Sequence, residues 1–222
     1  WQERVRKSNA ETTLIPYLKS RGVDRLDKLV LTHTDTDHMG DMLELAKHFS
    51  IREIYVSKGS MTQVDFVDKL KKMKAKVHGV EVGDRLPIFD SALEVLYPLT
   101  QGDGGNDDSI VLYGEFFRTK FLFTGDLEAP GEGQMVTAYP DLRVDVLKAG
   151  HHGSKGSSSP EFLEHIKPKL ALISAGKNNR YQHPHKETLD RFEKIQTKIF
   201  RTDEQGAIRF KGWNSWQIET VR

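Results

Sequence analysis

The sequence contains no cysteine among its 222 residues. This absence excludes a disulfide framework, a thiolate metal site and a cysteine nucleophile, and it leaves the redox compartment open. No apolar run approaches the roughly 18 residues that a membrane-spanning helix needs. The chain begins at Trp1, with neither a methionine nor the apolar segment of a signal peptide. We therefore expect the sequence to be a piece of a longer protein.

An excess of charge of one sign is also lacking, because 33 Lys and Arg oppose 32 Asp and Glu and leave a net charge of +1. No global basic field therefore indicates a nucleic-acid partner. Residues 143–186 nevertheless carry a local net charge of +5, from three acidic residues and eight basic ones: Arg143, Lys148, Lys155, Lys167, Lys169, Lys177, Arg180 and Lys186. A phosphodiester substrate near this stretch accounts for the excess, and a solvated helix face accounts for some of these lysines equally well.

Strand-like and helix-like segments alternate along most of the chain. Apolar residues at helical spacing predict helices at 12–20, 42–49, 64–73 (with Val64, Val67 and Leu70 on its apolar face) and 188–195. Short apolar runs predict strands at 29–31, 51–56, 110–113, 121–123, 144–148 and 170–174, with more in 77–98 and 199–221. The tail has predicted turns at Gly206 and Gly212, and we expect Trp213 and Trp216 to pack in the core. This order predicts one α/β domain over residues 1–222, with two sheets covered by helices on their outer faces.

The strongest chemical signal is the segment HTDTDH at 33–38, which lies between a predicted strand and a predicted helix. Alternate residues of an extended segment point the same way, so His33, Asp35 and Asp37 share a face, and the turn into the helix brings His38 round. Two imidazoles and two carboxylates suit a divalent metal such as zinc or manganese. The alternative, a solvated acidic loop, requires two of the nine histidines to fall beside two aspartates by chance.

A second candidate is Asp126, which follows the apolar strand in LFTGD at 122–126. Open α/β sheets place their sites at such strand ends. A simple Gly-Asp turn is an equally good interpretation of this segment taken alone. Beside the first motif, Asp126 becomes the natural ligand to bridge two metals.

Two histidine-containing loops follow the next two predicted strands. The segment GHHGSK at 150–155 offers His151 and His152 as metal ligands, and its glycines, Ser154 and Lys155 as donors to a phosphate. A glycine-rich surface loop is the alternative. The polar loop 178–186 adds His183 and His185, each a weaker candidate for a ligand or a phosphate contact.

Together these segments resemble the metallo-β-lactamase superfamily, whose signature is His-x-His-x-Asp-His followed by a strand-end Asp and further histidines. The chain is similar in particular to the metallo-β-lactamase-like domains of the ComEC family of DNA-uptake channel proteins. The matching segments are LVLTHTDTDHMG at 29–40, LFTGDLE at 122–128, DVLKAGHHGSK at 145–155, and 107–113, 158–162 and 178–189. The resemblance spans about residues 25 to 195 and implies an αββα sandwich with a metal site along one edge.

The resemblance also implies the ligands of two divalent ions, manganese or zinc. They are His33, Asp35, Asp37, His38, Asp126, His151 and His183. The double-histidine motif does not show which of His151 and His152 contacts a metal, and either His183 or His185 matches the late histidine of the family.

The chain departs from the superfamily pattern in three places. Asp35 stands where the signature has its second histidine. The middle histidine is absent, because Asn106-Asp107-Asp108-Ser109 stands in its place, so one ion is held weakly or is held by Asp35. The opening strands of the family, with their Asp-x-Gly-x-Gly-Asp pattern, are also absent, and we expect the sequence to begin inside the domain.

The implied activity is that of a metal-dependent nuclease that degrades the strand of DNA that is not imported during natural transformation. In this hypothesis two metals activate a water for attack on phosphorus, Asp37 or Asp126 accepts its proton, and Lys155 or His152 stabilises the departing phosphate. The implied partners are DNA, the membrane-channel part of the same polypeptide and other DNA-uptake proteins. The resemblance places the domain on the outer side of the cell membrane, and we expect the isolated domain to be a monomer.

Two other functions remain open at this point. One is a different hydrolase of the superfamily, such as a lactonase, a thioesterase or a β-lactamase. The local basic charge and the replacement at Asp35 argue against it. The other is a non-catalytic module that binds or positions DNA through a degenerate metal site, and the missing middle histidine favours it.

Overall fold

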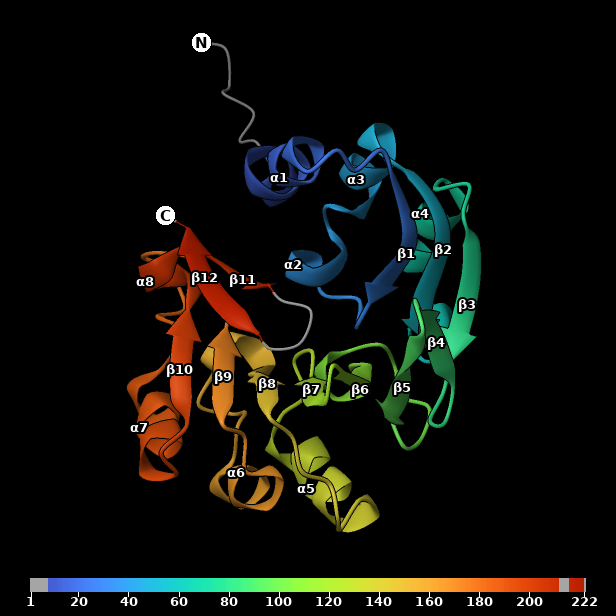
Figure 1. Cartoon of the computed structure of the whole chain (residues 1–222). Coiled ribbons are helices and arrows are strands. Elements are labelled where there is room, and N and C mark those ends of the chain that lie inside the picture. The colour runs from blue at the N-terminus through green and yellow to red at the C-terminus, as the bar shows by residue number, and fades with distance from the viewer. Residues whose placement is uncertain (1–7, 212–215, 222) are drawn as a thin grey trace.

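The structure, a computed structural model, describes residues 8–211 and 216–221, so Gly212 and Trp213 lie outside the described residues. Its strands form three sheets (Figure 1). A parallel sheet contains β1 (Arg25–Leu31), β2 (Ser50–Ser57) and β3 (Lys76–Val80) in that order. A hairpin contains β11 (Ala207–Lys211) and β12 (Gln217–Val221).

The third sheet has seven strands in the order β10-β9-β8-β7-β6-β5-β4. Their bounds are β4 (Arg85–Ile88), β5 (Ser91–Tyr97), β6 (Val111–Phe116), β7 (Thr119–Phe123), β8 (Val146–Lys148), β9 (Leu170–Ile173) and β10 (Lys198–Arg201). Strands β4 to β7 are antiparallel, with β6 and β7 forming the predicted hairpin. Strands β7 to β10 are parallel, so their carboxyl ends lie at one edge of the sheet.

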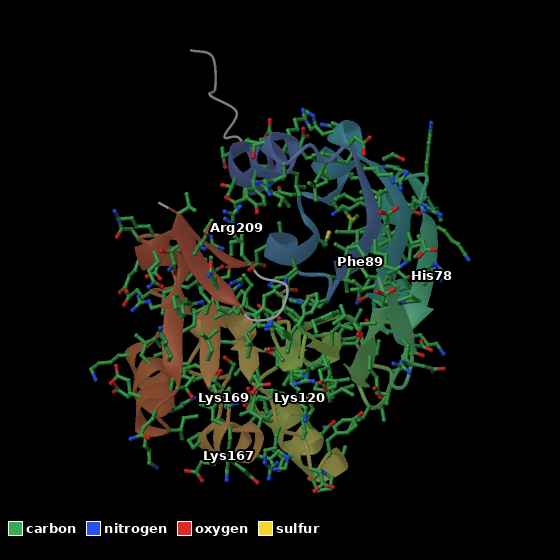
Figure 2. All side chains as sticks on the ribbon, viewed as in Figure 1. His78, Phe89, Lys120, Lys167, Lys169 and Arg209 are labelled. Atoms are coloured by element: carbon green, nitrogen blue, oxygen red, sulfur yellow. The ribbon has the colours of Figure 1, made fainter. Side chains whose placement is uncertain are left out.

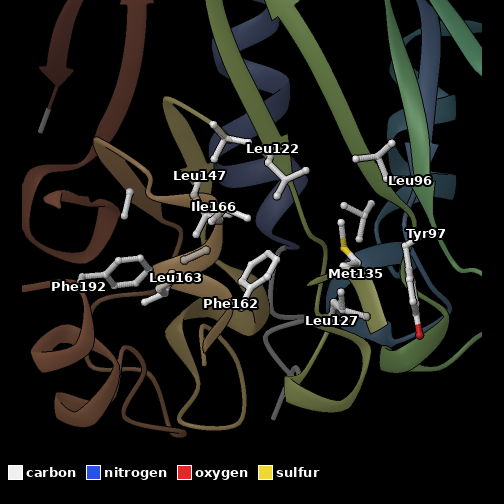
Figure 3. Packing of buried hydrophobic residues seen from close by; sticks show 14 of the residues in the cluster. Leu96, Tyr97, Leu122, Leu127, Met135, Leu147, Phe162, Leu163, Ile166 and Phe192 are labelled. Atoms are coloured by element: carbon white, nitrogen blue, oxygen red, sulfur yellow. The ribbon is translucent and has the colours of Figure 1, made fainter. Parts of the chain in front are cut away.

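Helices cover the outer face of each large sheet, as the sequence predicts. The π-helix η1 (Ala10–Leu14), α1 (Ile15–Ser20), α3 (Met42–His48) and α4 (Val64–Lys71) pack on β1–β3 through a cluster that includes Ile54 and Phe66. On the seven-stranded sheet, α5 (Ala129–Ala138), α6 (Pro160–Ile166) and α7 (Lys186–Lys194) pack through Met135, Phe162 and Phe192 (Figure 3). Short helices occur at α2 (Thr36–Met39), η2 (Ser60–Thr62), η3 (Asn106–Asp108), η4 (Gly150–Gly153) and α8 (Thr202–Gln205).

The inner faces of the sheets pack on one another in two places. Tyr55 and Val80 of the three-stranded sheet meet Val95 and Ile110 beside the β4–β6 half of the large sheet. The β11–β12 hairpin covers the β7–β10 half, where Trp216 packs against Phe121 as predicted. The αββα sandwich is therefore confirmed.

One prediction about a helix face is wrong. Val64 is 73% exposed, whereas Phe66, Leu70 and Met73 are buried. Val64 precedes Phe66 by two residues, or about 200° around the helix, so the two side chains cannot face the same sheet. The large ring of Phe66 takes the buried side, because it removes more apolar surface from water.

Candidate metal centre

The segments that carry the predicted ligands meet at one edge of the sandwich. His33 lies two residues after the end of β1, and α2 carries Asp37 and His38. Asp126 follows β7, and η4, with the double histidine, follows β8. Figure 1 shows α2 in the space between the end of β1 and the ends of β8 and β9. Because parallel strands end at a common edge, side chains that are far apart in the sequence converge there.

The carboxylate of Asp126 lies at the middle of this group. Its Oδ2 atom is 3.1 Å from Nε2 of His38, 3.7 Å from that of His152, 3.8 Å from that of His151 and 4.0 Å from that of His33. The Asp126 side chain is only 3% exposed. Four imidazole nitrogens thus surround one buried carboxylate, which is the position expected for a bridging ligand.

The carboxylates of Asp35 and Asp37 lie near different histidines of this group. Asp35 Oδ2 is 3.9 Å from His33 Nε2, whereas Asp37 Oδ2 is 3.2 Å from His152 Nε2. One ligand atom from each of four residues lies within 4.8 Å of the others, and these residues are Asp37, His38, Asp126 and His152. Among the described residues the geometry therefore has one group of four converging donors, and Asp35 lies beside it, next to His33.

Hydroxyl groups hold the first two histidines through their Nδ1 atoms. His33 Nδ1 lies 3.0 Å from Thr32 Oγ1 and 3.2 Å from Ser109 Oγ, and His38 Nδ1 lies 3.2 Å from Thr32 Oγ1. Contacts of this kind orient an imidazole so that its other nitrogen faces the metal. The sequence analysis missed both hydroxyls, although Thr32 directly precedes the motif.

The double histidine is held in the same way. His151 Nδ1 lies 2.9 Å from Glu128 Oε1, and His152 Nδ1 lies 2.8 Å from the carbonyl oxygen of Ser174. Both residues adopt left-handed backbone conformations, with φ of 44° and 54°, which are uncommon outside glycine. These conformations direct both Nε2 atoms back toward Asp126. The structure therefore brings both histidines to the centre, and which of them contacts a metal stays a prediction.

Several potential ligand atoms at the centre are buried with few or no protein partners. Among the described residues, His33 Nε2 and Asp126 Oδ1 are buried without a hydrogen bond, and His38 Nε2 has only the Asp126 carboxylate beside it, at 3.1 Å. Buried polar atoms without a partner are costly, and each one calls for an explanation. A divalent cation coordinated by imidazole nitrogens and carboxylate oxygens would satisfy all three. The residues present therefore fit the metal that their chemistry implies.

The protonation states also favour a cation. Burial and the nearby charge of His38 lower the pKa of His33 to about 4, so that its imidazole is neutral at pH 7. Burial alone raises the pKa of Asp126, but the hydrogen bond to His38 and the charges of His38, His152 and His151 outweigh it and hold the pKa at about 2. Metals bind neutral imidazoles and ionised carboxylates, so these two ligands are ready at neutral pH.

We expect the metal-free protein to lose stability as the pH falls from about 6.5 to about 4. Between these values His33 takes up a proton in the unfolded chain but not in the folded one, so the free energy of unfolding decreases with decreasing pH. The difference in pKa corresponds to about 3 kcal/mol. Urea titrations in EDTA at several pH values measure it, with H33N as the control that loses the contribution of His33 and keeps the one that His183 makes over the same pH range. Equal pH dependence in both proteins would contradict the assignment.

The polar loop 178–186, which contains His183 and His185, borders the centre. The ring of His183 lies 5.6 Å from that of His151 and 6.2 Å from that of His152, measured between centroids. Burial, followed by the charges of His185, His151 and His152, lowers the pKa of His183 to about 4. His185 Nδ1 instead accepts a hydrogen bond of 3.1 Å from the backbone N–H of Lys155. His183 is thus the nearer of the two to the double histidine, and its role as a ligand stays a prediction.

Lys155 lies beside this loop with its side chain exposed. Within the described part of the chain its ammonium group has no hydrogen bond and no ion pair. Its predicted contact with phosphate therefore stays a prediction.

The segment in place of the middle histidine contributes a hydroxyl. Asp108 faces away and accepts hydrogen bonds from Ser57 Oγ at 2.6 Å and Gly102 N at 2.9 Å. Ser109 Oγ accepts the backbone N–H of Asp126 at 3.0 Å and also contacts His33. A Cβ added to Gly125, whose φ is 55°, would lie 2.9 Å from the Ser109 side chain, so only glycine permits this approach. Ser109 therefore positions two ligands.

The basic stretch at 143–186 does not form one surface. Arg143, Lys167 and Lys169 precede β8 and β9, and Figure 2 shows Lys167 and Lys169 at the end of the sheet away from α2. Lys148 and Lys155 lie instead at or after the carboxyl end of β8. Only part of the predicted basic charge is therefore near the centre.

A groove of about 690 Å³ opens beside the centre. Asp37 and His38 lie on its wall together with Leu31, Met42 and Lys177. The Asp37 carboxylate is 57% exposed, so a ligand in the groove can reach it directly. Among residues 8–211 and 216–221, no helix is long and apolar enough to cross a membrane.

Comparison with known proteins agrees with this fold and site. Residues 3–177 match the metallo-beta-lactamase superfamily. The chain therefore belongs to the metallo-β-lactamase superfamily, whose members are typically metal-dependent hydrolases. The metallo-beta-lactamase fold protein YhfI from Bacillus subtilis has a TM-score of 0.57 and 13% identity, over 88% of this chain and 81% of that one. At this low identity the likeness shows the fold alone.

Within the superfamily the relatives are more specific. The chain is 38% identical to ComE operon protein 3 of Bacillus subtilis (strain 168), over 95% of this chain and 28% of that protein. It is 34% identical to competence protein ComA of Neisseria gonorrhoeae, over 90% of this chain and 27% of that protein. The resemblance to the ComEC family is thus confirmed. The chain spans about a quarter of the length of these relatives.

Proposed function

We propose that this domain is a metal-dependent nuclease that hydrolyses phosphodiester bonds of DNA, acting on the strand that is not imported. The observation that carries the proposal is the buried Asp126 carboxylate, with four imidazole nitrogens within 4.0 Å and two further carboxylates beside it. The competence relatives supply the substrate class, because DNA is what such systems take up. The same relatives support a place at the cell envelope, next to a membrane channel in the same polypeptide and to other DNA-uptake proteins.

The residues around Asp126 would hold two divalent ions, manganese or zinc. Asp126 lies at the middle of the group, and the ligands would be Asp126, His33, Asp35, Asp37, His38, His151 and His183. When bound, such ions supply Lewis-acid activation of a water and of a phosphoryl group. Two ions also agree with the buried donors that have no protein partner.

In the proposed reaction, side chains of the protein transfer the proton and stabilise the departing oxygen. Asp37 faces the groove and accepts the proton of the attacking water. His152 lies 3.2 Å from Asp37 and stabilises the departing oxygen by donating a hydrogen bond. Lys155 is the second cation able to neutralise that oxygen. Asp126 stays ionised throughout, since its pKa is about 2.

A non-catalytic DNA-binding module is the second candidate. Ser109 favours it, because a hydroxyl that positions ligands replaces a residue that would coordinate metal in the superfamily. With one donor fewer, an ion near His33 would be held less firmly. The two candidates differ in whether bound DNA is cleaved.

Cleavage of end-labelled single- and double-stranded DNA tests the proposal. We expect cleavage with Mn²⁺ or Zn²⁺, none with EDTA, and none by a D37A/D126A double variant, because that variant lacks the shared ligand and the base. A β-lactam, a lactone and a thioester serve as competing substrates. Binding without cleavage under every metal would favour the non-catalytic module, and turnover of a competing substrate alone would favour another hydrolase.

A further inference from the structure

Lys148 is a cation beside the centre that the proposed mechanism does not use. It is the last residue of β8 and precedes His151 by three positions. Val146 packs on the inner face of the sheet and Leu147 on the outer face, so the alternation of a strand places Lys148 on the inner face. Its Nζ atom donates a 2.9 Å hydrogen bond to the carbonyl oxygen of Ala149, at the start of η4. The ammonium group therefore lies at the base of the double-histidine loop.

This ammonium group lacks an anionic partner. Within the described residues Lys148 forms no ion pair, and its side chain makes only the bond to Ala149. Burial lowers the pKa of Lys148, and the charge of Asp126 opposes this effect. Cations bound at Asp126 would neutralise that carboxylate and leave Lys148 facing positive charge. A partly buried ammonium in such surroundings needs an anion, and a phosphate oxygen supplies one.

Phe123 occupies the matching position on the neighbouring strand. It is the last residue of β7, precedes Asp126 by three positions and pairs in register with Lys148. Its ring stacks on Phe121, at 6.2 Å between centroids and 8° between planes, so its orientation is set. The side chain nevertheless remains 36% exposed. A fixed, partly exposed aromatic ring is a stacking surface for a nucleobase.

Resting on the proposed nuclease function, we infer that Phe123 and Lys148 form a nucleotide subsite next to the metal centre. Lys148 binds an oxygen of the phosphate adjacent to the scissile one, and Phe123 stacks on the base of that nucleotide. Neighbouring strands are about 4.8 Å apart and the two residues are in register on the same face, so one nucleotide can contact both. The subsite reads no base identity, so it serves a single strand of any sequence. It requires an unpaired base, which favours single-stranded over double-stranded DNA.

Binding of a fluorescent phosphorothioate (dT)8 strand, which resists cleavage, tests the subsite in the metal-loaded protein. We expect K148M to weaken binding at least about 10-fold and to lower the slope of log affinity against log salt by about 0.7, the value for one phosphate of a single strand. K167M is the matched control, because it removes an exposed lysine at the far end of the sheet. It should leave both quantities unchanged.

Phe123 has its own test. F123A should weaken binding of the same strand about 10-fold or more, in the range for loss of one stacked base. It should not change binding of a strand whose nucleotides are abasic, and F123W should restore binding of (dT)8. If K148M loses metal or unfolds at a lower temperature, K148R and F123A decide the question, because K148R keeps the charge and Phe123 is partly exposed.

The subsite and the nuclease can fail separately. If the unaltered protein cleaves DNA while K148M and F123A bind (dT)8 as K167M does, the subsite is overturned and the nuclease stands. If no strand is cleaved but both variants lose binding as described, the subsite stands and the catalytic function is overturned. Equal affinity for single- and double-stranded DNA would also contradict the subsite.

Discussion

Replacing Asp126 with asparagine should abolish metal binding at the centre and reduce DNA cleavage by about 1,000-fold or more. The carboxylate lies within 4.0 Å of all four imidazole Nε2 atoms, and an asparagine side chain would offer a cation held there no negative charge. Loss of a residue that merely orients a ligand costs about 10- to 100-fold in metal affinity or activity, so loss of a shared ligand should cost more. Elemental analysis of the metal content and a cleavage assay under saturating metal measure both effects.

D145N is the matched control for this substitution. Asp126 follows a strand, whereas Asp145 precedes one and lies at the opposite end of the sheet, where it pairs with Lys169 and accepts the backbone N–H of Lys120. We expect D145N to keep its metal and its activity, because an asparagine oxygen can still accept the bond from Lys120. A D126N protein that retains both ions and cuts DNA at the normal rate would disprove the central role of Asp126.

Adding metal to the metal-free protein should raise its unfolding temperature by about 8 to 16 °C. An ion at 1,000 times its dissociation constant stabilises the folded state by about 4 kcal/mol. Each kcal/mol shifts the midpoint of a domain of this size by about 2 to 4 °C. The buried atoms His33 Nε2 and Asp126 Oδ1 are the physical reason, because the ion gives each of them a partner that the described residues do not supply.

Thermal unfolding with Mn²⁺, Zn²⁺, Mg²⁺ or EDTA measures this stabilisation. Imidazole-rich ligands suit Zn²⁺ and Mn²⁺ better than Mg²⁺, so the smallest shift should occur with Mg²⁺. H38N should reduce the shift with Zn²⁺, and D145N should not. An unfolding temperature that no metal changes, in protein shown to be free of metal, would mean that the cluster binds no ion.

The sequence by itself determined the layers of the fold and the core of the candidate site. Apolar periodicity specifies a strand or a helix from neighbouring residues alone, and the predicted strands from 29–31 to 170–174 all occur. His33, Asp35, Asp37 and His38 were found together because they are contiguous, and their proximity needs no long-range contact. The predicted apolar face at Val64 was wrong, because the choice between two possible apolar faces of a helix depends on which side chains pack against the sheet.

Only the tertiary structure decided which distant groups meet at Asp126. The register of β7 on β8 sets Phe123 beside Lys148, and this register depends on the pairing of two residues that are 25 positions apart in the chain. Left-handed backbone at His151 and His152 turns both rings inward, and local propensity disfavours that conformation. The basic residues at 143–186 belong to one stretch of the chain, yet they lie at two ends of the sheet. Because β8 and β9 are parallel, residues that precede them lie at one end and residues that follow them lie at the other. Packing and strand direction, rather than local sequence, therefore assembled the site.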